Sequence, residues 1–395
     1  MSAPPHEEIA MRAVQLGVGT VGSDIAKRIA EENPDVDLIV ADYRVAAAEA
    51  VAGPLNARAV HVDANDPASL AEVIDGADVV INAVGPFYKY GRTILQAVVD
   101  AGAHYVDICD EYDVTHDIFT DEALGKRVAD AGRTVMMGCG ATPGMSNVAG
   151  KWAIEQLDTA ETIDMYLLVP HHPTLGATVN DHMLYALSGN VIEYLDGSMQ
   201  QVPAWEGVEH KEMPEGIGAF DFGWFGHPEP ITWALSYPDL QRSTIRFSWK
   251  PGEVNELWQL FNKLGLTHDQ ELPRLGVVPR QVLAHLMDDP AGQRMIEVDH
   301  GSSTLASAWM IEAKGTKDGR PATARAHTVM HYGDLAQSGG SMLTAWLAAE
   351  AATGILQGTI TQRGVLAPEQ VFPARETVER YAAYTGINVV LTPAT

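Results

Sequence analysis

Three glycines near the start of the chain have the spacing that can bind a dinucleotide. Gly17, Gly19 and Gly22 form the pattern G-x-G-x-x-G, which lets the backbone turn tightly and approach a pyrophosphate closely. Asp42 stands 20 positions after the last glycine, where a carboxylate accepts hydrogen bonds from ribose hydroxyls and repels a 2′-phosphate. Arg44 has the opposite effect on cofactor preference, because its guanidinium can hold the 2′-phosphate of NADP. The pattern therefore predicts a nicotinamide dinucleotide site in which NAD is favoured and NADP is possible.

The segments on both sides of the glycines fit this interpretation. An apolar strand at residues 12–16 runs into the motif, a helix at residues 21–32 follows it, and a strand at residues 36–41 leads to the acid. The start of the helix, with Thr20 and Val21, supplies free N–H groups and the positive end of the helix dipole to the phosphates. Glycine-rich turns that bind nothing can have the same spacing, but they do not require these flanking elements and the acid.

Strands and helices continue to alternate through the first third of the chain. The expected strands are residues 59–62, 79–83, 105–108 and 134–137, and the expected helices are residues 45–52, 67–74, 91–101 and 121–131. This alternation predicts an α/β fold with a doubly wound parallel sheet of the Rossmann type. Ligands of such sheets bind beyond the carboxyl ends of the strands. We therefore expect further cofactor contacts from residues that follow strand ends, namely Asp63, Ala64, Gly85, Pro86 and Phe87.

Hydride transfer to or from a carbon that bears an amine also needs a group that moves a proton. Glu111 and Asp110 follow one expected strand, and Tyr90 and Lys89 follow its neighbour, so all four belong to the same edge of the sheet. These side chains can move protons when burial tunes their pKa. Each also has an ordinary alternative, since an acid after a strand often caps the next helix and a tyrosine often only packs. The four residues are the candidate catalytic groups.

The position of the remaining polar residues relative to this edge separates candidate substrate contacts from structural residues. Tyr88, Arg92 and Asn147 lie where a substrate would bind, so they are the candidate substrate contacts. His104 opens its strand and should lie at the opposite edge, which favours a structural role. Cys139 lies between glycines with no histidine fixed beside it, which favours a small buried thiol over a nucleophile.

Two other groups of residues have types that bind metals or carboxylates. His171, His172 and His182 have no standard zinc spacing, so no metal site is predicted. Four arginines in the second half are candidate carboxylate clamps, with surface positions as the alternative: Arg242, Arg246, Arg274 and Arg325.

Length and composition limit the class of protein. The 395 residues are enough for two domains with a sizeable core. A formal net charge of −26 argues against nucleic acid as a partner. The two cysteines cannot form a disulfide framework and suit a reducing compartment. Neither a membrane-spanning run nor a signal-peptide core is evident, so we expect a cytoplasmic protein that acts on a small molecule and not at a membrane.

The strand–helix alternation stops near Asn147, which suggests a boundary between domains. Residues 1–147 are expected to form the dinucleotide-binding domain, and residues 148–335 an inserted α+β domain of mixed, mainly antiparallel strands. A helix at residues 343–353, a further helix at 374–384 and a short strand at 388–391 follow. We expect residues 336–395 to return to the first domain and complete it.

With these motifs in place, the chain resembles the saccharopine dehydrogenase family. The resemblance rests on the glycine motif with Asp42 and on four other stretches, at residues 82–91, 101–111, 138–147 and, more weakly, 364–369. In size and in its single glycine motif, the chain is most similar to the lysine 6-dehydrogenase-like branch. One departure is Thr142, where several saccharopine-forming members carry an acid, and this argues against amino-acid binding of the saccharopine type.

The resemblance implies a Rossmann domain built from both ends of the chain, with an inserted domain for substrate binding and dimerisation, and hence a homodimer. It also implies hydride transfer at a carbon–nitrogen centre in amino-acid metabolism. The favoured hypothesis is an NAD(P)-dependent oxidoreductase that acts on an amine or amino acid at its C–N bond. Two alternatives stay open, namely a carbonyl or enoyl reductase on the same fold and a non-catalytic dinucleotide-binding sensor.

Overall fold

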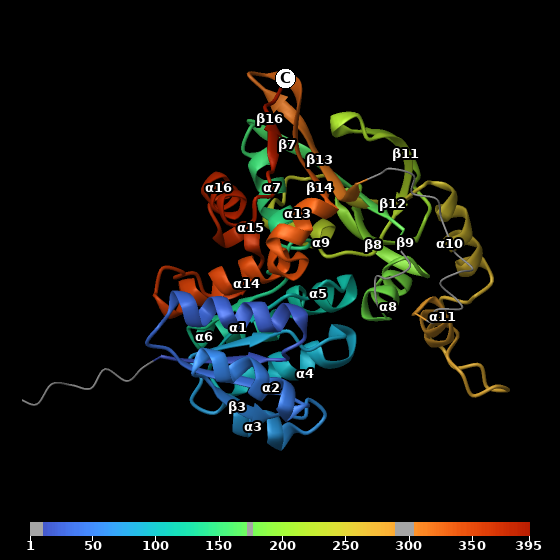
Figure 1. Cartoon of the computed structure of the whole chain (residues 1–395). Coiled ribbons are helices and arrows are strands. Elements are labelled where there is room, and N and C mark those ends of the chain that lie inside the picture. Colours follow the sequence, from blue (N-terminus) through green and yellow to red (C-terminus); the bar gives the residue numbers. More distant parts are fainter. Residues whose placement is uncertain (1–10, 172–176, 289–303) are drawn as a thin grey trace, which may run out of the picture. The chain divides into compact units, whose positions relative to one another are not determined.

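The chain divides into two compact units. The computed structural model describes residues 11–171, 177–288 and 304–395, so the polar start of the chain and His172 lie outside the described residues (Figure 1). Unit 1 comprises Met1–Cys109, Asp117–Gly144 and Gly340–Val371, and unit 2 comprises Asp110–His116, Met145–Gly339 and Phe372–Thr395. No helix within the described ranges is both long enough and apolar enough to cross a membrane.

Unit 1 is built on a seven-stranded, entirely parallel sheet in the order β15-β6-β5-β4-β1-β2-β3. The strands are β1 (Arg12–Leu16), β2 (Asp37–Asp42), β3 (Arg58–His61), β4 (Val79–Asn82), β5 (His104–Asp107), β6 (Thr134–Met136) and β15 (Gly364–Leu366). Strands β1 and β4 at its centre are apolar and almost wholly buried, as strands covered on both faces require. The order confirms the doubly wound, Rossmann-type fold that the sequence predicted.

Helices join these strands and cover the sheet of unit 1. They are α1 (Thr20–Glu32), α2 (Val45–Ala52), α3 (Pro67–Ile74), α4 (Phe87–Asp100), α6 (Glu122–Asp130), α14 (Gly340–Leu356) and α15 (Pro368–Val371), with a 3-10 turn at Gly53–Leu55. Helix α14 packs along α1, as Figure 1 shows. The buried guanidinium of Arg28 on α1 lies 2.6 Å from a carboxylate oxygen of Glu350 and 5.5 Å from the ring centroid of Trp346. This packing ties the late segment of the chain to the first helix of the sheet.

Unit 2 contains a nine-stranded mixed sheet. Its main path is β10-β11-β12-β7-β13-β14-β16, and β8 pairs with both β12 and β9. The strands are β7 (Thr159–Pro170), β8 (Asn190–Leu195), β9 (Ser198–Pro203), β10 (Glu209–Met213), β11 (Gly218–Trp224), β12 (Arg242–Lys250), β13 (Leu305–Lys317), β14 (Arg320–His331) and β16 (Val390–Thr392). Only β7 and β12 pair in parallel along this path, so the sheet is mainly antiparallel, as expected.

The helices of unit 2 are α7 (Met145–Ile154), α8 (Ala177–Ala186), α9 (Glu229–Ser236), α10 (Glu253–Lys263), α11 (Pro279–Asp288), α13 (Tyr332–Ser338) and α16 (Ala374–Thr385), with a 3-10 turn at Pro214–Gly216. Helix α5 (Tyr112–Phe119) begins in unit 2 and ends in unit 1. Helices α7 and α9 pack together where Gly150 meets the ring of Trp233. A side chain at position 150 would prevent this contact, because an added Cβ would lie 2.4 Å from the ring.

The end of the chain is divided differently from the ranges that the sequence suggested. Residues 340–371 belong to unit 1, but residues 372–395 belong to unit 2 instead of completing the first domain. The physical reason is that α16 packs on α7 and β16 extends the second sheet by pairing with β14, with Val390 opposite His327. The short strand was expected from the sequence, but its partner was not.

His104 is held as a neutral acceptor at the amino end of β5. Its Nδ1 accepts a hydrogen bond of 2.9 Å from the backbone N–H of Thr134, and Nη1 of Arg133 lies 3.5 Å from Nε2. Burial, together with the positive charges of Arg133 and Arg363, lowers the pKa of His104 to about 4. The position at the start of the strand fits a structural role.

This histidine should make stability depend on pH in mildly acidic solution. The ordinary pKa of an unfolded histidine is about 6.5. As the pH falls from there toward 4, the unfolded chain binds a proton that the folded chain excludes, so the free energy of unfolding falls. We expect a loss of about 2 kcal/mol from this residue between pH 7 and pH 5. Urea denaturation of His104→Asn, which keeps a short acceptor for Thr134, should show a flatter dependence than the wild type. If the free energy of unfolding fell by the same amount between pH 7 and pH 5 in the variant and in the wild type, this assignment would be contradicted.

Candidate active site

The loop between β1 and α1 combines two glycines that the fold requires with one that leaves open space. Gly17 has φ of +80°, and an added Cβ at Gly22 would lie 2.0 Å from the carbonyl oxygen of Gly17. Gly19, at the N-cap of α1, has no atom within 4 Å of where a Cβ would stand, and no side chain caps the helix. The uncapped helix start and this space fit a pyrophosphate, which the N–H groups of α1 would hold.

The carboxylate of Asp42 is fixed at the end of β2. One oxygen accepts a hydrogen bond of 3.0 Å from the backbone N–H of Val18, and the other accepts one of 2.8 Å from the N–H of Arg44. The side chain of Arg44 is 73% exposed, and its Nε lies 3.7 Å from Asp42 Oδ1. Each carboxylate oxygen has a second acceptor site, so Asp42 can still receive two ribose hydroxyls.

A cavity of about 250 Å³ lies beyond the carboxyl ends of β1 to β4, and half of the predicted cofactor contacts line it. Asp63 lies at its side, where hydrogen bonds from the backbone and side chain of Asn65 lower the pKa of its carboxyl. The lining brings together seven residues predicted from the sequence: Gly17, Gly19, Asp42, Asp63, Ala64, Gly85 and Tyr90. The residues present therefore fit a nicotinamide dinucleotide.

The other predicted residues of unit 1 lie around this cavity without forming its described lining. Thr20 and Val21 form the first turn of α1, while Gly22 packs the helix on the loop. Pro86 is the N-cap of α4, and Phe87 is the buried first residue of this helix.

The residues of α4 that were predicted to meet the substrate are mostly exposed. Tyr88 and Lys89 are exposed, and Nζ of Lys89 lies 4.7 Å from the ring centroid of Tyr90. Arg92 forms an ion pair with Asp121, so its guanidinium already has an anionic partner.

Buried polar side chains with no role predicted from the sequence hold the loops at the same edge. Asn82 donates a 3.0 Å hydrogen bond to the hydroxyl of Tyr105 and accepts one of 2.9 Å from the N–H of Val84. One oxygen of Asp107 accepts from the N–H groups of Gly138 and of Cys109, at 2.8 and 3.1 Å. The signal that could have identified Asn82 and Asp107 is a polar residue that ends an otherwise apolar strand.

The thiol of Cys139 lies in this buried region. Burial, together with the negative charges of Asp107 and Glu369, raises the pKa of Cys139 well above its usual range. A thiol that stays protonated is a poor nucleophile. The structure thus supports the interpretation of Cys139 as a packing residue.

Unit 2 gathers the two acidic candidates around a histidine. Asp110 and Glu111 precede α5, and His182 lies on α8. One ligand atom from each lies within 4.8 Å of the others, and His182 Nδ1 is 3.5 Å from Asp110 Oδ2. Burial lowers the pKa of His182, and the Asp110 carboxylate opposes this shift. A neutral imidazole beside two carboxylates can accept, hold and return a proton. The same donor set suits a divalent cation, so the expected absence of a metal stays a prediction.

A second histidine, His227, is buried and extends this group into the core of unit 2. The ring of His227 lies 6.0 Å from that of His182 and stacks on Phe225 at 5.1 Å. Nδ1 of His227 pairs with the fully buried carboxylate of Glu229, which also accepts a 2.6 Å hydrogen bond from Ser146. Sequence reasoning considered His182 only as a metal ligand and gave His227 no role, because nothing in their spacing relates them to the acids.

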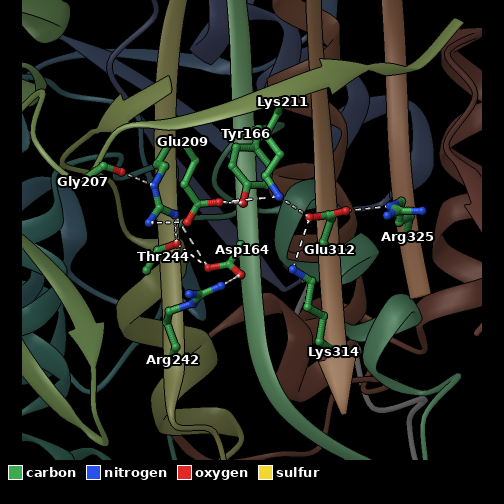
Figure 2. Close-up of polar contacts among 11 residues, drawn as sticks. Asp164, Tyr166, Gly207, Glu209, Lys211, Arg242, Thr244, Glu312, Lys314 and Arg325 are labelled. Atoms are coloured by element: carbon green, nitrogen blue, oxygen red, sulfur yellow. Dashed lines mark hydrogen bonds and ion pairs between the residues drawn. The ribbon is translucent and has the colours of Figure 1, made fainter. Parts of the chain in front are cut away.

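Two groups that the sequence offered for substrate binding have structural partners instead. Asn147 is 1% exposed, donates a 2.8 Å hydrogen bond to Thr232 and accepts one of 3.3 Å from Trp233, so it joins α7 to α9. The proposed clamps Arg242 and Arg246 are both paired with carboxylates within the second sheet. Figure 2 shows the pair of Arg242 with Asp164.

The charged side chains in Figure 2 form a band across β12, β7, β10, β13 and β14. Nη2 of Arg242 lies 2.5 Å from buried Asp164, and Nη2 of Arg246 lies 2.9 Å from Glu209. Lys211 and Arg325 donate to Glu312 at 2.8 and 2.7 Å. Burial alone would raise the pKa of Glu312, but these two hydrogen bonds lower it. The expectation of carboxylate clamps is therefore wrong for Arg242, Arg246 and Arg325, because carboxylates of the chain itself occupy them.

The fold and the cleft define a nicotinamide-dependent oxidoreductase with a Rossmann domain. Sequence profiles then identify the family: residues 13–136 match the saccharopine dehydrogenase NADP binding domain, and residues 140–384 match the saccharopine dehydrogenase C-terminal domain. The chain belongs to the saccharopine dehydrogenase family, as its motifs predicted, and is an NAD(P)-dependent dehydrogenase of that type.

Curated relatives match over nearly their whole length. The carboxyaminopropylagmatine dehydrogenase of Synechocystis is 23% identical over 381 residues, which cover 91% of this chain and 92% of the relative. The carboxynorspermidine synthase of Vibrio alginolyticus is 26% identical over 409 residues, which cover 92% and 93%. The structure of saccharopine dehydrogenase (L-Glu forming) from Saccharomyces cerevisiae has the same fold, with a TM-score of 0.64, 17% identity and coverage of 98% and 100%.

The open space at Gly19 predicts a substitution that separates cofactor binding from stability. Gly19 has φ of −62° and ψ of −169°, which alanine adopts readily, so Gly19→Ala should melt close to the wild type. Its methyl group would occupy room that the pyrophosphate needs, so we expect NADH to bind about tenfold or more weakly. Titration by NADH fluorescence measures this. Gly53→Ala, at another uncrowded helical glycine, is the matched control, and equal affinity of both variants would contradict the cofactor position.

Proposed function

We propose that this dehydrogenase transfers hydride between a nicotinamide cofactor and the C–N bond of a small amine or amino acid. The observation that carries the proposal is the group of Asp110, Glu111 and His182 in unit 2. The chain passes directly from Cys109, the last residue of its segment in unit 1, to this group. Two full-length relatives whose names describe amine products or substrates support the same chemistry.

A proton must leave the nitrogen when an amine is oxidised to an imine, and it must return when the imine is reduced. When bound, the nicotinamide supplies or accepts the hydride. The carboxylate of Glu111, which is 4% exposed, is the group proposed to take the proton. Asp110 would stabilise the imidazolium that His182 forms if the proton moves on, because the two side chains are 3.5 Å apart. Tyr90, in the lining of the dinucleotide cavity with Lys89 beside it, is proposed to orient the reacting groups.

We further propose that NAD is the preferred cofactor. Both oxygens of Asp42 are fixed by backbone N–H groups, so the carboxylate cannot turn away from a 2′-phosphate without losing two hydrogen bonds. The guanidinium of Arg44, which is 73% exposed, is accessible to a phosphate and would keep NADP binding measurable.

Replacing Asp42 with alanine should therefore weaken NAD binding more than NADP binding. The loss of a hydrogen-bonded carboxylate should raise the Kd for NAD about tenfold and leave that for NADP unchanged or lower. Arg44→Ala is the reciprocal control and should affect NADP alone. Calorimetric titration of both variants with both cofactors measures the four constants, and equal losses for NAD and NADP would contradict the preference.

Replacing Glu111 with glutamine should slow turnover and leave NADH binding intact. Loss of a proton-transfer group reduces kcat by about a hundredfold or more. Absorbance at 340 nm with a panel of amines, amino acids and hydroxy acids identifies the substrate on which this is measured. Glu206→Gln, at an exposed carboxylate of the same unit, is the matched control. Unchanged turnover would remove Glu111 from the mechanism, and turnover with hydroxy acids alone would favour a carbonyl reductase.

A further inference from the structure

A second cavity, of about 400 Å³, lies within unit 2 and was not anticipated from the sequence. Its walls come from the start of α5, the end of α8, the start of α11 and the loops at residues 188–190 and 267–270. Aromatic, acidic and hydroxyl side chains line it, with a buried guanidinium: Tyr112, Asp113, Tyr185, Ser188, Asp269 and Arg280.

This cavity adjoins the group proposed to move the proton. Helix α8 carries both His182 and Tyr185, which are three residues apart and therefore lie about one helical turn, ~5 Å, from each other along the axis. The segment that supplies Glu111 also supplies Asp113. Burial, a hydrogen bond to Asp113 and the nearby charge of Glu111 all raise the pKa of Tyr185. The negative charge of the Glu111 carboxylate is thus close enough to the cavity wall to act on the hydroxyl of Tyr185.

The charges around the cavity favour a cation. Nε of Arg280 lies 3.4 Å from Asp181, and its guanidinium lies 5.2 Å from the ring centroid of Tyr185. Because Asp181 balances the charge of Arg280, the carboxylates of Asp113 and Asp269 remain as the negative charges in the cavity lining. The imidazole of His268 also lies in the lining. A second positive group entering the cavity would meet two carboxylates and the oxygen of the Ser188 hydroxyl.

The packing of the tyrosines keeps these acceptors in place. The hydroxyl of Tyr112 donates a 3.0 Å hydrogen bond to the carbonyl of Asn190, and its ring lies 5.7 Å from that of Tyr185. Asp113 accepts a 2.8 Å hydrogen bond from the N–H of Val114. The carboxylate of Asp113 is therefore oriented by the fold before any ligand binds.

We propose that this cavity binds the second, non-reacting cationic nitrogen of a short diamine or guanidino-amine substrate. The proposal rests on the proposed function, which places the reacting nitrogen at Asp110, Glu111 and His182. A separation of one helical turn corresponds to a spacer of about three or four methylene groups. An ammonium or guanidinium offers several donors, and Asp113 and Asp269 offer the charged acceptors.

Calorimetric titration of the NAD-saturated protein with 1,4-diaminobutane and with butylamine tests this subsite. The diamine should bind about tenfold or more tightly than the monoamine. Asp113→Asn, which keeps a side-chain oxygen as acceptor, should lower diamine affinity about tenfold and leave butylamine unchanged. Asp269→Asn, at an exposed position, is a second variant that removes one charge with little risk to folding. Asp196→Asn, in the exposed β8–β9 turn of the same unit, is the matched control and should change neither affinity.

Equal affinity for the two amines, or no binding of the diamine, would overturn the proposal. Tighter binding of 4-aminobutyrate than of the diamine would overturn it as well, because the cavity would then be an anion subsite of Arg280. Turnover separates this inference from the proposed function. A preference for the diamine without turnover of any amine would contradict the chemistry and support the subsite. Equal turnover of butylamine and the diamine would support the chemistry and contradict the subsite.

Discussion

The contact between the backbone of Gly17 and the backbone of Gly22 is the constraint on which unit 1 depends. No side chain fits there, since a Cβ at Gly22 would lie 2.0 Å from the carbonyl oxygen of Gly17. The amide of Gln15, fully buried beneath the loop, donates to the carbonyls of Leu16 and Gly17 at 3.1 and 3.0 Å. The loop carbonyls are thus satisfied inward, and the start of α1 is left without a side-chain cap. Close packing and an anion site are two results of the same geometry.

Local patterns were enough to predict this part of the molecule. The glycine spacing, β1 and Asp42 are all set by residues within one βαβ unit, where hydrophobic pattern and turn chemistry act over short distances. The same reasoning gave the parallel sheet and the position of His104 at the start of β5. The polar anchors Asn82 and Asp107 were harder to recognise, because their roles depend on loops that follow other strands.

The features that could not be predicted from the sequence depend on contacts between segments that are far apart in the chain. Arg242 reaches Asp164 across 78 positions because β12 and β7 lie side by side in parallel register. His182 meets Asp110 only because α8 folds beside the start of α5. No periodicity or spacing encodes such pairs, so the sequence predicts neither the carboxylate partners of the arginines nor a role for His182. The partner of β16 was missed for the same reason.

Charge balance distinguishes the two polar regions of unit 2. In the band of Figure 2, the buried carboxylates of Asp164 and Glu312 each meet more than one cation. The surplus positive groups reach solvent, with the side chain of Arg325 48% exposed, so no buried charge is left uncompensated. Such a network compensates its own charges and leaves little electrostatic free energy for a ligand to gain.

The cavity beside α8 has the reverse arrangement. Its buried charge is the guanidinium of Arg280, 8% exposed and already matched by Asp181, while Asp113 and Asp269 are left in excess. Two carboxylates that line one cavity attract a cation, and the attraction is screened less in a partly enclosed space than at an open surface. The two regions lie in the same unit and use the same residue types. The balance of charge around each, and not its polarity, therefore separates a structural network from a candidate binding site.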